Sequence, residues 1–335
     1  MSSILPASPV TCSVDLAAPG VHHGHLRLPH SRDTSAWGTL LIPLTVVSHG
    51  QGPTALLTGG NHGDEYEGPI ALFDLARSLG AEDIQGRVII VPAMNYPAFL
   101  DAKRTSPVDG GNLNRLFPGH PRGSLTEKIA DYFQRYLLPL ADFVLDFHSG
   151  GKSLDFVPFA AAHHLGDPPH EAACRQAMLA FAAPYSVTLR ELDAVGMYDT
   201  AAENLGKVFV STELGGGGTA RAELVAIAKR GVRNFLCHAG ILAAQAEPAP
   251  TKLLAMPGDD CYVVSHHQGL VEPVVDLGAE VAAGALLARV YDVQRTGAAV
   301  AEYRAPRGGI LIGRHFPGLV QVGDPLAILG VAEGD

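Results

Sequence analysis

The chain has 335 residues, of which 47% are hydrophobic and 17% are charged. This composition excludes a disordered chain, and the length predicts a large core and two domains. The formal net charge of −10, from 24 basic and 34 acidic residues, argues against a nucleic-acid surface, because phosphate binding requires clustered lysines and arginines.

No apolar run reaches the ~20 residues that a membrane-spanning helix needs. The first residues lack a basic segment followed by an apolar core, so we expect no signal peptide and a cytoplasmic location. The cysteines are far apart and form no C-x-x-C pair: Cys12, Cys174, Cys237 and Cys261. They are predicted to be free thiols that bind no metal.

The N-terminal 50 residues combine short strand-like runs with turns. The segment from Thr39 to Val47 predicts an early strand pair of the main sheet. The histidines between Val21 and His25 are interpreted as surface side chains, because neither a strand end nor a carboxylate accompanies them.

A glycine-rich turn after an apolar run presents the first candidate site residues, His62 and Glu65. The run from Ala55 to Leu57 predicts the end of a buried strand, and a helix is expected over residues 68–79, which indicates a βαβ unit. Open α/β sheets place their sites at the carboxyl ends of strands. The His-x-x-Glu spacing would let both side chains bind one Zn²⁺. An ordinary polar loop is the alternative that this motif alone leaves open.

A β-branched run at residues 87–91 predicts a strand buried on both faces, and a long polar loop follows it to about residue 123. Long loops within compact domains are usually functional. This loop contains Asn114 and Arg115, and an arginine can bind a carboxylate through two parallel hydrogen bonds. A structural ion pair of Arg115 is the alternative.

Two later apolar runs also end in groups that suit metal or acid–base chemistry. One run ends at His148, and the other ends at Glu213, which a run of glycines follows. A catalytic zinc commonly has three protein ligands and an open position, and a further group acts as base for its water. The pattern predicts His62, Glu65 and His148 as ligands of one zinc per chain, with Glu213 as the general base.

Further helices are expected in the sequence both before and after the His148 strand. A capping box at residues 124–127 predicts a helix start, and a second helix is expected over about residues 169–182. Two helices, separated by Gly231, are expected over residues 219–242. The glycine-broken segment 193–198 carries polar groups that could edge the pocket.

The predicted secondary structure changes from alternating helices and strands to short strands after a proline- and alanine-rich stretch, residues 246–250. This stretch predicts a domain boundary. Short β-rich runs recur over residues 251–335 and resemble a small lipoyl-like β-barrel. A biotinyl or lipoyl carrier needs a lysine to modify, and no lysine follows Lys252. We therefore expect a rim or assembly domain that is never lipoylated.

Four motifs together resemble the succinylglutamate desuccinylase and aspartoacylase family. The motifs are His62-Gly-Asp-Glu65, Asn112-Leu-Asn114-Arg115, Asp146-Phe-His148 and Thr212-Glu213-Leu. The resemblance extends from about residue 50 to 245 and includes a C-terminal β-domain. It implies an α/β fold in which residues 1–250 form a zinc-carboxypeptidase-like three-layer α/β/α domain with a mixed sheet. Residues 251–335 would form the small β-barrel domain.

The resemblance also implies a zinc-dependent amidohydrolase. Asn114 and Arg115 match the pair that binds the substrate carboxylate in this family. An upstream arginine stabilises the oxyanion in the family, and Arg104 is the candidate here, although the intervening segment is longer. The Trp37-Gly region, His148-Ser-Gly-Gly and Glu213-Leu followed by four glycines are most similar to the branch that deacetylates N-alpha-acetyl-L-2,4-diaminobutyrate during ectoine breakdown.

Three other functions remain open: a deacylase for N-acetylaspartate or N-succinylglutamate, a metallocarboxypeptidase, and a non-catalytic zinc-binding module. Glu213 argues against the last, since a binding module needs no base. A dicarboxylate would need a second cationic clamp, which no motif supplies. The acidic neighbours Asp64, Glu67 and Asp155 favour a substrate with a free amine. The expected partner is a small N-acyl amino acid, without nucleic acid or membrane, and a homo-oligomer is left open.

Overall fold

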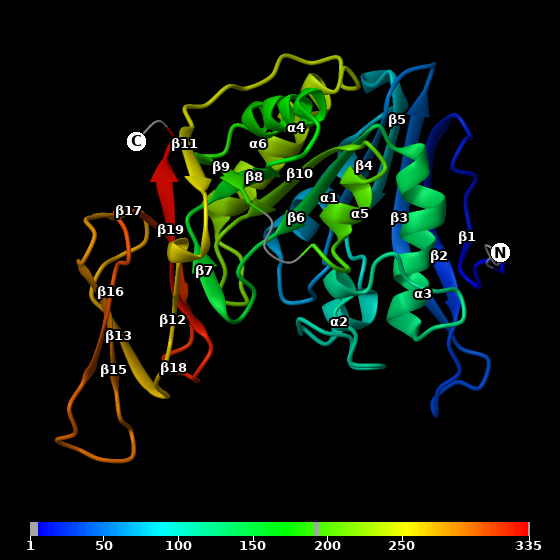
Figure 1. Ribbon diagram of the computed structural model, residues 1–335. Coiled ribbons are helices and arrows are strands. Elements are labelled where there is room, and N and C mark those ends of the chain that lie inside the picture. Colours follow the sequence, from blue (N-terminus) through cyan, green and yellow to red (C-terminus); the bar gives the residue numbers. More distant parts are fainter. Residues whose placement is uncertain (1–5, 191–193, 334–335) are drawn as a thin grey trace.

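The computed structural model describes residues 6–190 and 194–333 and has a large mixed sheet at its centre (Figure 1). The middle of this sheet has the spatial order β3 (Thr39–His49), β5 (Gly86–Val91), β4 (Thr54–Gly59), β6 (Phe143–His148), β10 (Val208–Glu213), β8 (Phe159–His163) and β9 (Tyr185–Leu189). One edge continues through β2 (Gly20–Pro29) and β1 (Thr11–Cys12). The other edge continues through β11 (Lys252–Met256), β19 (Pro325–Ala332), β17 (Gly309–His315) and β14 (Glu280–Val281).

The strands β5, β4, β6 and β10 are parallel, so their carboxyl ends meet at one edge of the sheet. The register pairs Gly59 of β4 with Phe147 of β6, and it pairs His148 of β6 with Glu213 of β10. Ligand crevices of open α/β sheets lie beyond such strand ends. The register alone therefore brings the His148 and Glu213 segments together.

Helices cover both faces of the sheet. Successive strand residues point to opposite faces, so Leu57 packs in one core and Leu56 in the other. The first core includes residues of α1 (Glu67–Ser78), α4 (Pro168–Phe181) and α6 (Ala222–His238). The second includes residues of α3 (Leu125–Tyr132) and α5 (Tyr198–Glu203). The mixed α/β fold is thus confirmed, with the sheet between two helical layers.

Several predicted helices are confirmed. The helices expected over residues 68–79 and 169–182 correspond to α1 and α4. The capping box of α3 is formed: Ser124 Oγ accepts from the Glu127 amide at 3.2 Å, and Glu127 Oε2 accepts from the Ser124 amide at 2.7 Å. Shorter helical segments are α2 (Tyr96–Leu100) and the turns Ala81–Asp83, Leu113–Arg115, Phe133–Leu137, Leu138–Leu140 and Asp259–Cys261. Within the described residues, no helix is long and apolar enough to cross a membrane.

Two predicted breaks are wrong. Gly231 does not interrupt the helix, because α6 continues through it from Ala222 to His238. The glycine is required by packing rather than by a turn: a Cβ at this position would lie 2.2 Å from Cζ of Phe181. The expected strand pair is one strand, β3, whose partner is β2 with the N-terminal histidines.

The strands after residue 251 belong to two sheets. β11 is parallel to β9, and β17 pairs with β7 (Leu154–Phe156), so backbone hydrogen bonds join both to the first 250 residues. β12 (Tyr262–Val264) pairs with β19. A separate antiparallel sheet has the order β16 (Ala301–Arg304), β15 (Leu286–Tyr291), β13 (Gly269–Pro273) and β18 (Leu319–Val320). β-rich structure is confirmed here, whereas the closed barrel and the domain boundary near residue 250 stay predictions.

Candidate active site at the carboxyl ends of β4, β6 and β10

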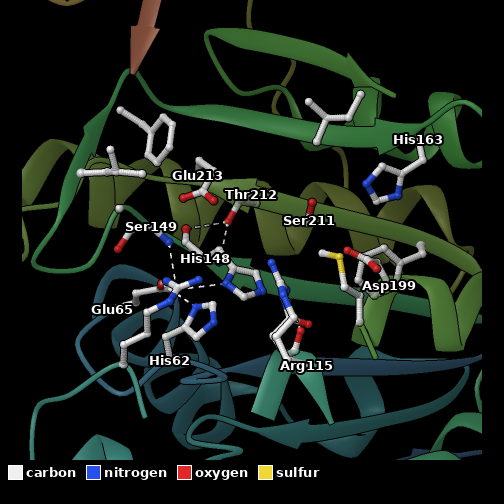
Figure 2. A pocket seen from close by; sticks show the side chains of 18 of the residues that line it. His62, Glu65, Arg115, His148, Ser149, His163, Asp199, Ser211, Thr212 and Glu213 are labelled. Atoms are coloured by element: carbon white, nitrogen blue, oxygen red, sulfur yellow. Dashed lines mark hydrogen bonds and ion pairs between the residues drawn. The ribbon is translucent and has the colours of Figure 1, made fainter. Parts of the chain in front are cut away.

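A cavity of about 430 Å³ lies at the ends of the parallel strands (Figure 2). Every predicted site residue lines this one cavity: His62, Glu65, Arg104, Asn114, Arg115, His148 and Glu213. The structure therefore brings together groups that the sequence spreads over about 150 residues, as expected from the strand order. Most of the cavity is built from loops and strand ends of the main sheet, and Tyr262 of β12 contributes from the C-terminal part.

Three of these groups form a compact cluster. The carboxylate of Glu65 lies between two imidazoles, with Oε1 2.8 Å from Nδ1 of His62 and Oε2 3.1 Å from Nδ1 of His148. His62 and Glu65 are buried, and His148 is 11% exposed on its side chain. Glycine is needed in this turn, since a Cβ at Gly63 would lie 2.0 Å from the backbone carbon of Ala98. The turn thus holds both side chains against β6.

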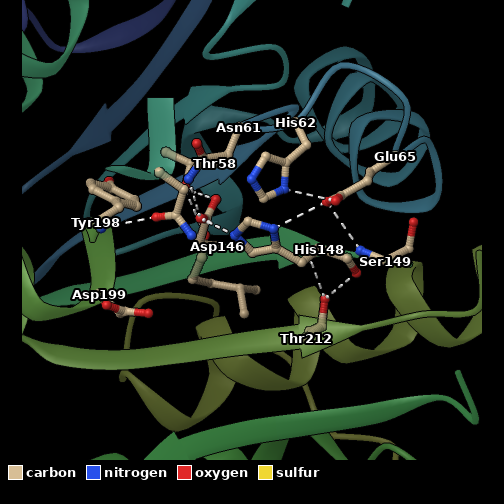
Figure 3. A network of polar contacts seen from close by, with 12 residues as sticks. Thr58, Asn61, His62, Glu65, Asp146, His148, Ser149, Tyr198, Asp199 and Thr212 are labelled. Carbon is tan, nitrogen blue, oxygen red and sulfur yellow. Dashed lines mark hydrogen bonds and ion pairs between the residues drawn. The ribbon is translucent and has the colours of Figure 1, made fainter. Parts of the chain in front are cut away.

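A second buried carboxylate, Asp146, orients His148 (Figure 3). Asp146 lies two residues before His148 on β6, so both side chains point to the same side of the strand. Its Oδ2 is 2.8 Å from His148 Nε2 and accepts from Asn61 at 3.2 Å, while its Oδ1 accepts from Thr58 at 2.7 Å. The contact with Asp146 leaves His148 Nδ1 for the cluster. Sequence reasoning quoted Asp146 in a motif but gave it no role, although the two-residue spacing was a usable signal.

The electrostatics of the cluster favour a cation. Burial by itself would raise the pKa of Glu65, but the neighbouring His62 and His148 outweigh it and hold that pKa far below the usual range. Burial lowers the pKa of His62. Burial also opposes protonation of His148, yet Asp146 and Glu65 raise the pKa of His148 well above its usual value. Positive charge is thus stabilised between these three side chains.

The donor set fits a divalent metal. His62, Glu65 and His148 each offer one ligand atom, and these atoms lie within 4.8 Å of one another. Two imidazoles and one carboxylate are a common ligand set of catalytic zinc, which leaves a position for water. The carboxylate partner of His148 also matches the outer-shell pattern of zinc-binding histidines.

Glu213 lies next to the cluster, directly across the β6–β10 ladder from His148. Its Oε2 atom is buried without a hydrogen-bond partner among the described residues. Burial, reinforced by the negative charge of Glu65, raises the pKa of Glu213 to about 8. A cation in the cluster would favour the ionised form of this carboxylate.

The remaining predicted residues come from the long loop. Arg104 Nη1 is 3.7 Å from Glu65 Oε1, and the Arg104 side chain is 47% exposed. Asn114 is buried, and its Oδ1 accepts from the Tyr198 amide at 3.0 Å. Arg115 Nη1 donates to the Asn114 carbonyl at 2.7 Å. Arg104 thus faces the His62–Glu65–His148 cluster, whereas Asn114 and Arg115 adjoin α5.

The structure also adds lining residues that sequence reasoning missed. His163 at the end of β8 and Asp199 in α5 both line the cavity. His163 Nδ1 is 2.8 Å from Glu203 Oε1. Of the segment 193–198, Met197 lines the cavity, while residue 193 lies outside the described residues. No strand-end motif marks Asp199, because it follows a loop.

The acidic residues expected to surround the substrate are placed elsewhere. Among the described residues that line the cavity, Asp64, Glu67 and Asp155 do not occur. Asp64 accepts from the Lys152 amide at 2.8 Å, and Asp155 pairs with Arg221 at 2.8 Å. Glu67 is buried in the first turn of α1, where burial raises its pKa to about 7. The prediction that Asp64, Glu67 and Asp155 face a free amine of the substrate in this cavity is therefore wrong.

Comparison with known proteins places the chain in a family. The catalytic domain of the succinylglutamate desuccinylase/aspartoacylase family matches residues 51–239. The chain is 56% identical over 324 residues to the N-alpha-acetyl-L-2,4-diaminobutyric acid deacetylase of Halomonas elongata, and the match covers 96% of this chain and 95% of that protein.

Solved structures agree with the sequence comparison over nearly the full length of each chain. The product-bound ectoine utilization protein EutE (DoeB) from Ruegeria pomeroyi is 61% identical with a TM-score of 0.96, and the match covers 97% of this chain and 99% of that one. A succinylglutamate desuccinylase from a Silicibacter species is 59% identical with a TM-score of 0.95, and the match covers 98% and 100%. The chain therefore belongs to the succinylglutamate desuccinylase/aspartoacylase family.

Proposed function

We propose that the protein is a zinc-dependent deacetylase that hydrolyses N-alpha-acetyl-L-2,4-diaminobutyrate to 2,4-diaminobutyrate and acetate. The observation that carries the proposal is the meeting of the His62–Glu65–His148 cluster with Glu213 and Arg115 in one cavity. The Halomonas elongata relative is named for this deacetylation, and the Ruegeria pomeroyi relative is described as an ectoine utilization protein. Membership of the family supports hydrolysis of an amide.

His62, Glu65 and His148 would hold one zinc ion per chain. Such an ion lowers the pKa of water to about 7 and polarises the acyl oxygen. The chain itself supplies orientation: Glu65 lies between the two Nδ1 atoms, and Asp146 fixes His148 through Nε2. This second contact keeps the His148 ring from turning.

Glu213 is proposed as the general base. In its ionised form it takes a proton from the attacking water and then delivers it to the nitrogen of the leaving amine. Its position supports this role, because Glu213 lies opposite His148 across the β6–β10 ladder. Its buried Oε2 atom has no hydrogen-bond partner among the described residues.

Two parts of the long loop would position the substrate. Asn114 and Arg115 would bind its carboxylate, and a guanidinium can donate two parallel hydrogen bonds to such a group. Arg104, close to Glu65, would place positive charge near the developing oxyanion. The proposed partner is thus a small N-acyl amino acid.

A dicarboxylate substrate is the second candidate. Three arginines line the cavity, Arg104, Arg115 and Arg190, so a second cationic group is present that the sequence motifs did not reveal. A relative of high identity is also described as a succinylglutamate desuccinylase. N-acetylaspartate or N-succinylglutamate would be the substrate in that case.

The test is a comparison of kcat/KM for N-alpha-acetyl-L-2,4-diaminobutyrate, N-acetylaspartate, N-succinylglutamate and a short peptide. The first should be preferred, and activity should disappear on chelation and return when zinc is added. Preference for a dicarboxylate would favour the second candidate, and preference for the peptide would indicate a carboxypeptidase. Activity that survives complete removal of metal would contradict zinc dependence.

A further inference from the structure

The cavity contains a carboxylate that the proposed chemistry does not use. Asp199 is 8% exposed, and it lines the same cavity as the His62–Glu65–His148 cluster (Figure 2). Its Oδ1 accepts from the amide and from the hydroxyl of Thr200. A carboxylate in a cavity wall can accept charge-assisted hydrogen bonds from a cationic group of a ligand.

The Asp199 segment packs directly on the proposed carboxylate clamp. Gly196 has φ +79°, and a Cβ at this position would lie 2.4 Å from the carbonyl oxygen of Arg115. The Gly196 carbonyl accepts from the Phe117 amide at 3.0 Å. One residue before Asp199, the Tyr198 amide donates to Asn114 Oδ1 at 3.0 Å. The backbones that carry Arg115 and Asp199 are therefore held side by side.

The position of Asp199 is also fixed by the core beneath it. The preceding residue, Tyr198, is fully buried among aromatic rings. Its ring centroid lies 4.9 Å from that of Phe117, 6.0 Å from that of Phe133 and 5.9 Å from that of Phe209. This packing holds the first turn of α5, so the Asp199 carboxylate is a preorganised wall of the cavity.

We propose that Asp199 determines specificity by binding the free side-chain ammonium group of the substrate while Arg115 binds the carboxylate. Opposite charges on two adjacent segments of one cavity match an N-acylated diamino acid, which carries both charges. A dicarboxylate would instead bring a second anion towards Asp199, where like charges repel. This inference rests on the proposed function and names the group that selects its substrate.

The decisive variant is Asp199→Asn, which keeps the side-chain shape and an oxygen that can accept from Thr200. Its kcat/KM for N-alpha-acetyl-L-2,4-diaminobutyrate should fall roughly 10- to 100-fold, as expected when a hydrogen bond to a charged group is lost. Its kcat/KM for N-alpha-acetyl-L-2-aminobutyrate, which has the same skeleton without the amine, should be nearly unchanged. The preference over N-acetylaspartate should also decrease.

The matched control is Asp74→Asn, which removes the same charge from α1 at a residue paired with Arg77 and Lys229 outside the cavity. It should leave both substrates unaffected, so that a general effect of net charge is excluded. An equal loss of kcat/KM for both substrates in Asp199→Asn would overturn the inference and assign Asp199 a structural role.

A binding measurement separates this inference from the proposed function. Calorimetry should show that Asp199→Asn weakens binding of L-2,4-diaminobutyrate but not of L-2-aminobutyrate, whether or not the wild-type protein deacetylates either N-acetyl compound. Lack of turnover by the wild type would refute only the proposed function. Equal binding of L-2,4-diaminobutyrate by wild type and variant would refute the role of Asp199.

Discussion

At the scale of single residues, the proposed mechanism depends on one carboxylate acting as a base. We predict that Glu213→Gln retains its fold and its zinc but loses turnover by about 10²- to 10⁴-fold, the usual contribution of a general base. Glutamine has nearly the same shape but cannot take the proton. The measurement is kcat at saturating substrate together with the zinc content of the purified variant.

Glu82→Gln serves as a control for this variant, because the Glu82 side chain is 91% exposed and lies outside the cavity. Its turnover should equal that of the wild type. If Glu213→Gln turned over at a rate close to wild type, another group would have to be the base.

A second residue-scale prediction concerns the carboxylate behind His148. Asp146→Asn should weaken zinc binding by roughly 10- to 100-fold, the typical cost of losing an outer-shell partner of a metal ligand. Asparagine cannot offer a charged acceptor to both His148 and Asn61, so the imidazole loses its fixed orientation. Competition with a chromogenic chelator measures the change.

A variant of the proposed ligand His148 is the reference for the measurement of zinc affinity. His148→Ala should lose far more zinc than Asp146→Asn, since it removes a proposed ligand rather than its support. Unchanged zinc affinity in Asp146→Asn would show that Asp146 is needed only for packing. Full zinc content in His148→Ala would remove His148 from the ligand set.

At the scale of elements, the sequence predicted the site because its signals are local. The strands before His62, His148 and Glu213 are apolar runs that end in glycine-rich turns, and parallel strands place such ends at one edge. Asp199 was missed because long-range contacts, such as the packing of Gly196 on Arg115, bring its segment to the cavity. A contact between residues so far apart leaves no pattern in a single sequence.

The same reason explains the errors in the elements themselves. Gly231 looked like a helix break, but its neighbour is Phe181 of another helix, which the local sequence does not reveal. The local sequence of the C-terminal strands likewise does not reveal that β11 pairs with β9 and β17 with β7. Periodicity identified these strands correctly, whereas their partners depend on tertiary structure.

The packing of α6 on α4 gives a prediction at this scale. Gly231→Ala should destabilise the protein by about 1–2 kcal/mol, because overpacking a core typically costs ~1–3 kcal/mol and the better helix propensity of alanine returns at most ~1 kcal/mol. The Phe181 ring is fully buried and cannot move away freely. The midpoint of urea unfolding measures the change.

Gly166→Ala is the matched control, because no atom lies within 4 Å of a Cβ built at Gly166. It should leave the midpoint unchanged. A Gly231→Ala protein as stable as wild type would mean that α4 and α6 can separate enough to accept a methyl group.

At the scale of the whole molecule, Glu333 near the C-terminus forms hydrogen bonds with residues of α4 and of the main sheet. Arg175 of α4 donates from Nη1 and Nη2 to Glu333 at 2.7 and 2.6 Å, and Thr188 of β9 donates to Glu333 at 2.8 Å. The residue that directly follows β19 therefore contacts both a strand, β9, and a helix, α4, of the first 250 residues. The C-terminal part thus has a small hydrophobic core of its own, and it also shares a second core with the strands β7, β8 and β9.

This contact predicts a pH-dependent stability. The hydrogen bonds from Arg175 outweigh the opposing effect of burial and lower the pKa of Glu333. A carboxylate with a lowered folded-state pKa stabilises the fold above its unfolded value, near 4.5, and loses that effect as the pH falls through the folded value. Glu333→Gln should therefore be less stable than wild type at pH 7, by no more than about 1 kcal/mol because the pair is partly exposed.

The difference in unfolding free energy between wild type and Glu333→Gln should shrink as the pH falls below 4.5 and disappear once the pH lies below the lowered folded-state pKa, where Glu333 is neutral in both states. Comparing urea midpoints at the two pH values isolates Glu333, because every other titrating group is shared by the two proteins. Glu302→Gln tests a carboxylate whose ion-pair partners among the described residues, Arg304 at 2.7 Å and Arg289 at 3.5 Å, both lie in the separate C-terminal sheet, and at pH 7 it should cost less. A constant difference at all pH values would show that Glu333 stabilises the fold through packing, and that its charge does not join the C-terminal strand to α4.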